Sequence, residues 1–497
     1  MNNKSTMTGW RRMGALLLLS SLVLAACDSG TPATPTNPAP TNTTAAQAVA
    51  TDTTTTEAAP TNTTMAEEAE PTEPTTGGDD GAAGSGVRLN KDVSGEVEFW
   101  HHWSSPVRRN AIRRVIAACA VELPNVKVTE VAKPFGEVWT ANTAAVAAGS
   151  GMPDVLVSDR PKLPQDAANQ IYTNLGEWAE RDGVTGEQFW PFTWEQTLYQ
   201  GDTYGIPFET DVRVLFYNKV AFTEAGLDPA SPPKTWAELE AAADKLDKRN
   251  EDGTWARIAF FPLQGNISPE ILGYTNGVEW ISEDGTVNIN TPEAAETLAW
   301  AKKWVDRYGG WETIQAFRAG FQSPPNDAFM SGKVAMIVDV NGYASQLNFY
   351  NPQVEKGDGS GRTRLDWGVS DIPYNKQKAS YSGGFSFSIP RGADGAEAAW
   401  EFIKCATGKE GAASWSRDTY AMAANIEAAQ DPVLGSDPIW KFFLGAMEYS
   451  RSGTYLEAYP NWGEQLSQRY ERLWKGEITP EQLLQEAEQG IKDEIGQ

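Results

Sequence analysis

The sequence has 497 residues, a formal net charge of -25 at pH 7, and 22% charged residues. A chain this acidic is poorly suited to binding nucleic acid, because the phosphate backbone attracts basic surfaces. With two histidines, which are adjacent, and three cysteines, the chain offers little for histidine-based catalysis or metal binding and excludes a disulfide-rich scaffold. We expect no metal site and no cofactor.

Residues 1–26 have the layout of a secretory signal peptide. Arg11 and Arg12 precede an apolar run over residues 15–26, which is too short to span a bilayer. The run ends in Leu-Ala-Ala-Cys at residues 24–27, which resembles a bacterial lipobox. The sequence therefore predicts that Cys27 is acylated and anchors an exported protein to the membrane, in the periplasm or at the cell surface. An ordinary signal peptide with a chance cysteine is the alternative.

Residues 27–92 are dominated by Thr, Pro, Ala, Asn and Gly. Such a composition buries too little apolar surface to offset the entropy lost on ordering. We expect a disordered stalk, whose roughly 65 residues would reach about 45 Å as a flexible coil.

The folded part, from residue 93 to residue 497, is long for one core and suits two lobes with a cleft between them. Apolar and polar residues alternate over 97–100 and over 126–131, and each run predicts a strand. Apolar residues at helical spacing over 107–121 predict a helix between these strands. A helix over 135–148 and a strand over 153–157 follow. This order predicts a parallel α/β organisation.

Later elements continue the alternation of helices and strands. Thr235 and Thr291 are expected N-caps. The remaining elements are helices over 236–248, 292–308 and 396–406 and a strand over 334–338. The Asn-Glu-Asp-Gly run at 250–253 and the Ser-Glu-Asp-Gly run at 282–285 are interpreted as hairpin turns.

Cys119 and Cys405 both fall in helix-like stretches. We expect buried free thiols, which are common in such places, with one disulfide as the alternative in an oxidising compartment.

Tryptophan is abundant, with 19 residues in the chain. Most are expected in the core. Trp100, Trp103, Trp280 and Trp462 lie at predicted strand ends or loops, where a flat aromatic face near carboxylates and amides suits a sugar. A surface glycosidase stays an alternative, because the separation of its paired carboxylates is a property of the fold.

Several short motifs together resemble extracellular solute-binding protein family 1, the maltose-binding-protein-like group. The principal run is Tyr-Gly-Ile-Pro-Phe-Glu-Thr-Asp at residues 204–211. Matching stretches lie at 149–155, 215–219, 222–229, 233–239, 329–336, 382–384 and 476–482. Each motif is weak alone, but their order and spacing cover essentially the whole folded part.

The resemblance implies a two-lobed α/β fold of the type II periplasmic-binding-protein class, with a ligand cleft between lobes joined by hinge crossings. The first lobe would comprise residues 93–207 and 378–422, and the second 212–377 and 423–497. It implies a non-enzymatic, monomeric component of an ABC importer that delivers a sugar to permease subunits in the membrane. The same fold with a glycerol-phosphate-type solute, a polyamine or a peptide is the alternative.

Candidate ligand residues follow from the same resemblance. They are Asp159, Glu209, Asp211, Asp339, Tyr343, Gly383, Gly384 and Phe385. Trp103 and Ser104 are added because they follow the first strand, at the edge where open α/β sheets bind ligands. The alternative role of Asp211 is a helix cap or a hinge hydrogen bond. The alternative role of Gly383 and Gly384 is to form a tight turn. The family often carries a Leu-Pro-Val-Arg-like stretch that is absent at residues 421–425, where Asn425 is a candidate amide.

Overall fold

The computed structural model describes residues 87–282, 285–453 and 462–494. The predicted signal peptide, Cys27 and most of the predicted stalk lie outside these residues. Among the helices within them, none is both long and apolar enough to cross a membrane.

The described chain begins inside the segment that the sequence assigned to the stalk. Val87 and Leu89 pack against a hydrophobic core, and the Arg88 amide donates to the Asp182 carbonyl at 3.0 Å. The predicted stalk boundary at residue 92 is therefore too late, because these two apolar side chains find a buried surface.

A six-stranded sheet organises the first lobe. Its order is β16-β6-β15-β3-β1-β2, and β1 is parallel to β2 and β3, whereas β15 is antiparallel to β3 and β6. The N-terminal elements are β1 (Gly95–His101), α1 (Pro106–Glu122), β2 (Val126–Ala132), α2 (Glu137–Ala148), β3 (Val155–Asp159), η1 (Arg160–Lys162), α3 (Leu163–Ala168), α4 (Gly176–Asp182), η2 (Gly186–Gln188), α5 (Pro191–Glu195), β4 (Leu198–Tyr199), β5 (Asp202–Thr203) and β6 (Ile206–Thr210). The predicted β-α-β start is confirmed. The sheet is mixed, because β15 enters it directly after β14 and runs antiparallel to β3 and β6, and β16, which follows β15 through α12 and α13, also runs antiparallel to β6.

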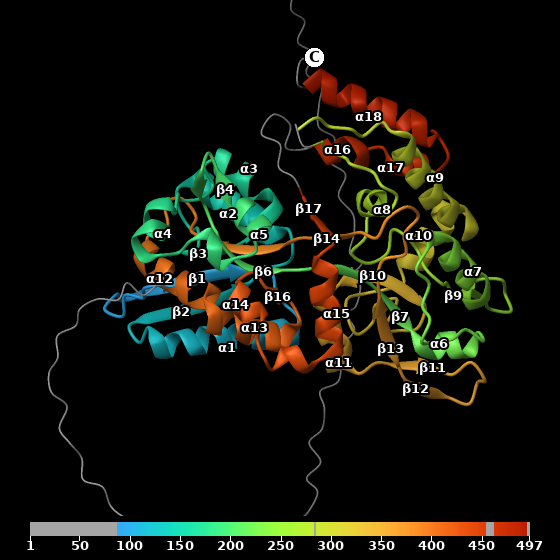
Figure 1. Cartoon of the computed structure of the whole chain (residues 1–497), viewed down its shortest axis with the longest axis horizontal. Helices are drawn as coiled ribbons and strands as arrows, with labels where there is room; N and C mark the ends of the chain where they lie inside the picture. The colour runs from blue at the N-terminus through green and yellow to red at the C-terminus, as the bar shows by residue number, and fades with distance from the viewer. Residues whose placement is uncertain (1–86, 283–284, 454–461, 495–497) are drawn as a thin grey trace, which may run out of the picture. The chain divides into compact units, whose positions relative to one another are not determined.

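Alternate residues of these strands enter two separate cores. Phe99 and Val157 join the core covered by α1 and by α12 (Ala396–Thr407), whereas Trp100 and Leu156 join the core that contains Val138 of α2. In Figure 1, α2 and α3 lie on one side of this sheet, and α1 and α13 (Lys409–Thr419) on the other. Both faces are thus buried, as the apolar strands require.

A three-stranded sheet of order β10-β7-β13 organises the second lobe. The elements of this middle segment are β7 (Arg213–Asn218), α6 (Lys219–Glu224), α7 (Trp236–Leu246), β8 (Lys248–Arg249), β9 (Trp255–Arg257), α8 (Pro269–Thr275), α9 (Pro292–Arg307), α10 (Trp311–Arg318), β10 (Met336–Val340), α11 (Tyr343–Tyr350), β11 (Gln353–Glu355), β12 (Arg362–Arg364) and β13 (Trp367–Ser370). The Thr235 and Thr291 caps are confirmed. The β8-β9 pair confirms the turn at 250–253, whereas the run at 282–285 includes residues outside the described ones.

The C-terminal part of the chain returns to both lobes. It comprises β14 (Ser380–Ser382), β15 (Gly384–Ser388), α12, α13, β16 (Met422–Ala423), α14 (Ile426–Ala429), η3 (Leu434–Ser436), α15 (Pro438–Met447), β17 (Ser450–Ser452), α16 (Trp462–Ser467), α17 (Tyr470–Trp474) and α18 (Pro480–Glu494). Ala428 and Ala429 pack with Ala412 and Ala413 of α13. Because α14 packs on α13, the first lobe continues past the predicted boundary at residue 422.

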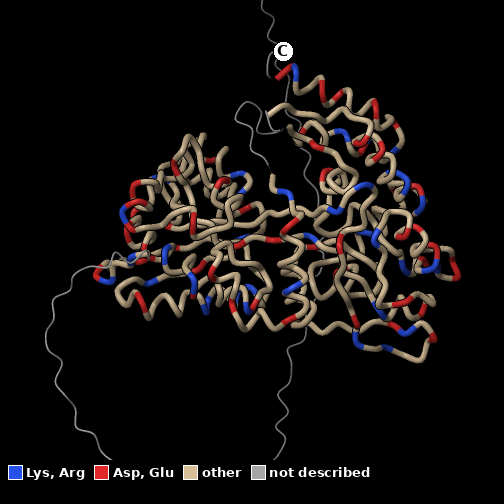
Figure 2. Tube along the Cα trace, viewed as in Figure 1, with Lys and Arg blue, Asp and Glu red and all other residues tan. Residues whose placement is uncertain are grey.

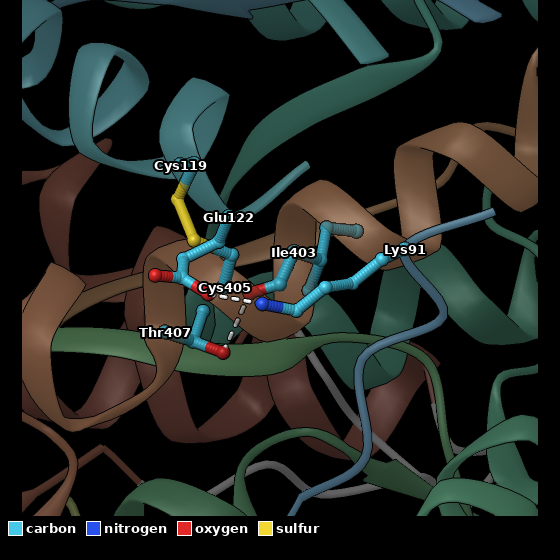
Figure 3. Close-up of a disulfide and its surroundings, with 6 residues drawn as sticks. All are labelled: Lys91, Cys119, Glu122, Ile403, Cys405 and Thr407. Carbon is cyan, nitrogen blue, oxygen red and sulfur yellow. Dashed lines mark hydrogen bonds and ion pairs between the residues drawn. A yellow bond between two sulfur atoms is a disulfide. The ribbon is translucent and has the colours of Figure 1, made fainter. Parts of the chain in front are cut away.

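Cys119 of α1 and Cys405 of α12 form a disulfide, with their Cα atoms 5.8 Å apart (Figure 3). The expectation of two free thiols is therefore wrong. Both helices pack on the same face of the sheet, which brings together cysteines that are 286 positions apart in the sequence.

Figure 2 shows acidic and basic residues interspersed along the described chain rather than separated into regions of one sign. Neither sign of charge is concentrated in one segment of the described chain.

Candidate ligand-binding site

A cavity of about 660 Å³, called the ligand cavity below, lies between the two sheets. The first-lobe sheet contributes the ends of β3, β6 and β15, and the second-lobe sheet contributes β10. Eight of the predicted ligand residues line it: Asp159, Glu209, Asp211, Asp339, Tyr343, Gly383, Gly384 and Phe385. Residues far apart in the sequence thus meet because the strands that carry them end at the same place.

Trp103 and Ser104 do not line the ligand cavity. The Trp103 side chain is only 1% exposed and packs against Trp415, with ring centroids 4.4 Å apart. Its indole therefore belongs to the first-lobe core, where a large aromatic ring buries the most apolar surface. Ser104 is exposed, outside the cavity.

The other candidates named for aromatic or amide character do not line the ligand cavity. Trp100 and Trp280 are buried, and Trp462 is partly buried. The Asn425 side chain accepts a hydrogen bond from the Ala428 amide at 3.0 Å, so it caps α14.

Asp159 is the last residue of β3 and lines the ligand cavity. Burial raises its pKa to about 6, partly offset by the positive charge of Lys162. Among the described residues, no group donates a hydrogen bond to this carboxylate. It is therefore available to accept a hydrogen bond from a ligand hydroxyl.

Glu209 lies in β6 and is 4% exposed. Burial raises its pKa to about 7, against the opposing effects of Arg108 and of the hydrogen bond from the Trp415 indole. The indole holds one carboxylate oxygen in place at the cavity wall.

Asp211 follows β6 and is tied to the protein. Its Oδ1 accepts hydrogen bonds from Arg213 Nη1 at 2.5 Å and from the Gly383 amide at 3.2 Å. The hinge hydrogen bond, which the sequence left as the alternative role, is thus present.

Gly384 has φ +130°, and a Cβ atom there would lie 2.3 Å from the Glu209 carbonyl oxygen and 2.8 Å from Arg160 Nη2. Only glycine fits this crossing. The close approach is to the neighbouring strand and to the buried Arg160, which donates to the Gly383 carbonyl and, at 3.0 Å, to Thr210 Oγ1.

In the second lobe, Asp339 Oδ1 accepts from Asn266 Nδ2 at 2.6 Å, and burial raises the Asp339 pKa to about 6. Tyr343 donates from its hydroxyl to Asp327 Oδ1 at 2.9 Å. The Tyr343 ring is only 4% exposed and packs on Phe216 and Phe329. The predicted stacking aromatic therefore presents little ring surface to a ligand.

The structure adds lining residues that the sequence analysis missed. Arg108 lies in the first turn of α1, Phe135 precedes α2, and Tyr381 belongs to β14. Phe135 is 68% exposed and meets the His102 ring edge-on, with centroids 5.1 Å apart. Arg108 lies in the first turn of the helix that follows β1, and Phe135 lies between β2 and α2. Closeness to these strand ends is the signal that could have identified both residues.

The cavity is rich in carboxylates. Five line it, namely Asp159, Glu209, Asp211, Asp327 and Asp339, against three cations, Arg108, Lys162 and Arg213. Within the described residues, no group of three or more His, Cys, Asp or Glu side chains is placed to hold a metal ion.

Residues 115–441 match the family model for bacterial extracellular solute-binding proteins. The chain belongs to this family. Among curated proteins, it is 27% identical over 433 residues to the sn-glycerol-3-phosphate-binding periplasmic protein UgpB of Shigella dysenteriae serotype 1, covering 82% of this chain and 94% of that protein. It is also 22% identical over 298 residues to a putative binding protein of Brucella abortus, covering 59% of this chain and 67% of that protein.

Solved structures of solute-binding proteins share the fold. CpMnBP1 with mannotriose bound superposes with a TM-score of 0.70 at 27% identity, covering 80% of this chain and 99% of that one. A Thermotoga lettingae ABC transporter solute-binding protein with α-D-tagatose gives a TM-score of 0.69 at 22% identity, covering 81% and 100%. UgpB from Mycobacterium tuberculosis in complex with glycerophosphocholine gives a TM-score of 0.65 at 19% sequence identity. The match covers 81% of this chain and 99% of that chain. The fold is that of the two-lobed periplasmic binding proteins.

Proposed function

We propose that this solute-binding protein is the capture component of an ABC importer, that it binds a sugar in the ligand cavity, and that it delivers the sugar to a membrane permease. The observation that carries the proposal is the carboxylate-rich lining drawn from both lobes. Carboxylate oxygens accept hydrogen bonds from sugar hydroxyls, while Phe135 and Phe385 offer apolar faces to the sugar ring.

The residue roles follow from this lining. Asp159, Glu209 and Asp339 accept from hydroxyls, and Asp211, Gly383 and Gly384 hold the crossing between lobes at the cavity wall. Ligand binding favours the closed arrangement of the lobes, with the crossings as hinges, so transport depends on a population shift and not on catalysis. The protein acts as a monomer, tethered through acylated Cys27 and a stalk of residues 27–86.

A thermal-shift and calorimetric panel of mono- and oligosaccharides tests the proposal. Ligand at 100 times its dissociation constant adds about 2.7 kcal/mol to the free energy of unfolding. Absence of both stabilisation and binding heat across the panel contradicts sugar binding, and sugars converted to products on long incubation indicate a glycosidase instead.

A glycerol-phosphate-type ligand is the second candidate, because UgpB proteins are among the relatives. Arg108 and Lys162 line the cavity and would be the partners of a phosphate. Five carboxylates around a phosphate would repel it, which is why we favour a neutral sugar.

Arg108→Met separates the two candidates, because methionine keeps an apolar stem but removes the charge. A phosphate ligand would lose on the order of 100-fold in affinity and bind more weakly with added salt. A neutral sugar would lose less than about tenfold, with affinity insensitive to salt. Glycerol 3-phosphate and the tightest-binding sugar of the panel are the two probes.

A further inference from the structure

Arg160 is a fully buried cation behind the wall of the ligand cavity. It follows β3 directly and begins η1, its exposed fraction is 0%, and it does not line the cavity. Its guanidinium donates from Nη1 to Gln196 Oε1 at 2.7 Å, from Nη2 to Thr210 Oγ1 at 3.0 Å, and to the Gly383 carbonyl. Within the described residues, it forms no ion pair with a carboxylate. A buried charge needs close polar partners, so these hydrogen bonds fix where the guanidinium lies.

Two segments of the chain cross between the lobes and are called the crossings below. They are residues 210–213, from β6 to β7, and residues 380–384, from the second lobe into β15. Thr210 Oγ1 of the first lies 2.9 Å from Ser382 Oγ of the second, and Ser382 Oγ donates to the Asp211 carbonyl at 2.6 Å. Thr210 is 0% and Ser382 1% exposed. Buried hydroxyls thus join the crossings at the point where the β6–β15 ladder ends.

These contacts form one chain of hydrogen bonds that begins at Arg160. A carbonyl only accepts, and a hydroxyl has a single proton, so Ser382 donates to the Asp211 carbonyl and accepts from Thr210. Thr210 in turn accepts from Arg160. Loss of the Thr210 hydroxyl would therefore interrupt the chain and leave a buried donor of Arg160 without its acceptor.

The crossings also form part of the cavity wall. Five of their residues line the ligand cavity: Asp211, Arg213, Tyr381, Gly383 and Gly384. Burial lowers the pKa of Arg160 to about 10, and the negative charge of Asp211 is the largest opposing effect. The space beside Gly384 is taken by the guanidinium, since a Cβ atom on Gly384 would lie 2.8 Å from Arg160 Nη2. Arg160 therefore supports this wall from the side away from the ligand.

We propose that Arg160 is a positioning residue for ligand binding, which through Thr210 and Ser382 holds the two crossings in the arrangement that receives the sugar. The proposal rests on the proposed sugar-binding function. Crossings that are fixed in advance reduce the conformational entropy that is lost on binding. Because Arg160 does not contact the ligand, it raises the affinity for every sugar that binds and does not choose among them.

Thr210→Val tests the proposal, because valine has nearly the shape of threonine but no hydroxyl. Thr210→Ser is the conservative variant that keeps the hydroxyl. Ser158→Ala is the matched control: Ser158 is 0% exposed, and its hydroxyl donates to the Ser386 carbonyl at 3.0 Å, which joins β3 to β15 inside the first lobe. Ser158 does not line the ligand cavity.

Calorimetry with the two tightest-binding sugars of the mono- and oligosaccharide panel measures affinity, and urea denaturation measures stability. We expect Thr210→Val and Ser158→Ala to lower the free energy of unfolding to a similar extent, since each removes one buried hydroxyl. Only Thr210→Val weakens binding, by about tenfold and by the same factor for both sugars. Thr210→Ser keeps wild-type affinity.

Arg160→Met is the direct variant. It should show the same loss of affinity, and adding Thr210→Val to it should cause no further loss, because both changes act on one chain of hydrogen bonds. Should Arg160→Met not fold, Thr210→Val and its control decide the question.

Three outcomes overturn the proposal. If Thr210→Val binds both sugars as the wild type does, or if Ser158→Ala weakens binding as much, the role of Arg160 is structural only and the sugar-binding function stands. A loss confined to one of the two sugars also contradicts a positioning role. If no sugar of the panel binds the wild type, the sugar-binding function fails together with the proposal.

Discussion

Arg213 donates from Nη1 to Asp211 Oδ1 at 2.5 Å, and the two residues flank the passage from β6 to β7. Their side chains are 14% and 17% exposed, and Arg213 also lies over the Tyr381 ring at 4.6 Å. The sequence predicts Asp211 as a ligand residue, with a hinge hydrogen bond as its alternative role. In the structure Asp211 lines the ligand cavity and is also paired with Arg213 at a crossing between the lobes.

Asp211→Ala should therefore lower the free energy of unfolding by about 1–3 kcal/mol, since it leaves a largely buried guanidinium without its carboxylate. Urea denaturation measures this loss, and calorimetry measures the accompanying loss of ligand affinity. A double-mutant cycle with Arg213→Ala isolates the pair. Strict additivity of the two single changes would mean that the contact contributes nothing to stability.

The Cys119–Cys405 disulfide joins α1 to α12 across 286 positions of sequence. Its reduction should lower the free energy of unfolding by about 2–5 kcal/mol, because the reduced unfolded chain gains conformational freedom. Thermal denaturation with and without dithiothreitol measures the change. The Cys119→Ala/Cys405→Ala variant should have the same thermal stability as the reduced wild type, and dithiothreitol should not change it. If dithiothreitol does not change the stability of the wild type either, the result argues against the disulfide.

Stability should decrease as pH rises from about 4 to about 7. Burial raises the pKa of Glu209 from 4.5 to about 7, and those of Asp159 and Asp339 from 3.8 to about 6. Between the unfolded and folded values, the folded state binds more protons, so a rise in pH favours unfolding. Urea denaturation at several pH values measures the slope.

Glu209→Gln is the matched variant for this slope, because glutamine still accepts from the Trp415 indole but does not titrate. Its stability should depend less on pH than that of the wild type. Parallel profiles for the two proteins would exclude Glu209 as a source of the pH dependence.

Phe135→Ala should weaken sugar binding by about 1–2 kcal/mol while changing stability little, because the ring is 68% exposed and lines the ligand cavity. Phe349→Ala is the control, since Phe349 is 54% exposed and lies outside that cavity. Calorimetry compares the two variants. Equal affinities would remove Phe135 from the site.

Local sequence patterns were sufficient to predict the first secondary-structure elements and the protein family. The alternation at residues 97–100 and 126–131 and the cap at Thr235 depend on neighbours in the sequence, so β1, β2 and α7 formed as predicted. The ordered motifs predicted the solute-binding family, and eight of the predicted residues line one cavity.

The packing of distant segments determines whether a residue that follows a strand lies in the core or in the cavity wall. Trp103 and Phe135 each follow a strand, yet one is buried in the core and the other lines the cavity. The local sequence pattern does not encode this difference. The difference depends on how helices from distant segments of the chain cover the sheet. For the same reason, Cys119 meets Cys405 and Asp211 meets Arg213 only once the long-range packing and the crossings between lobes are formed.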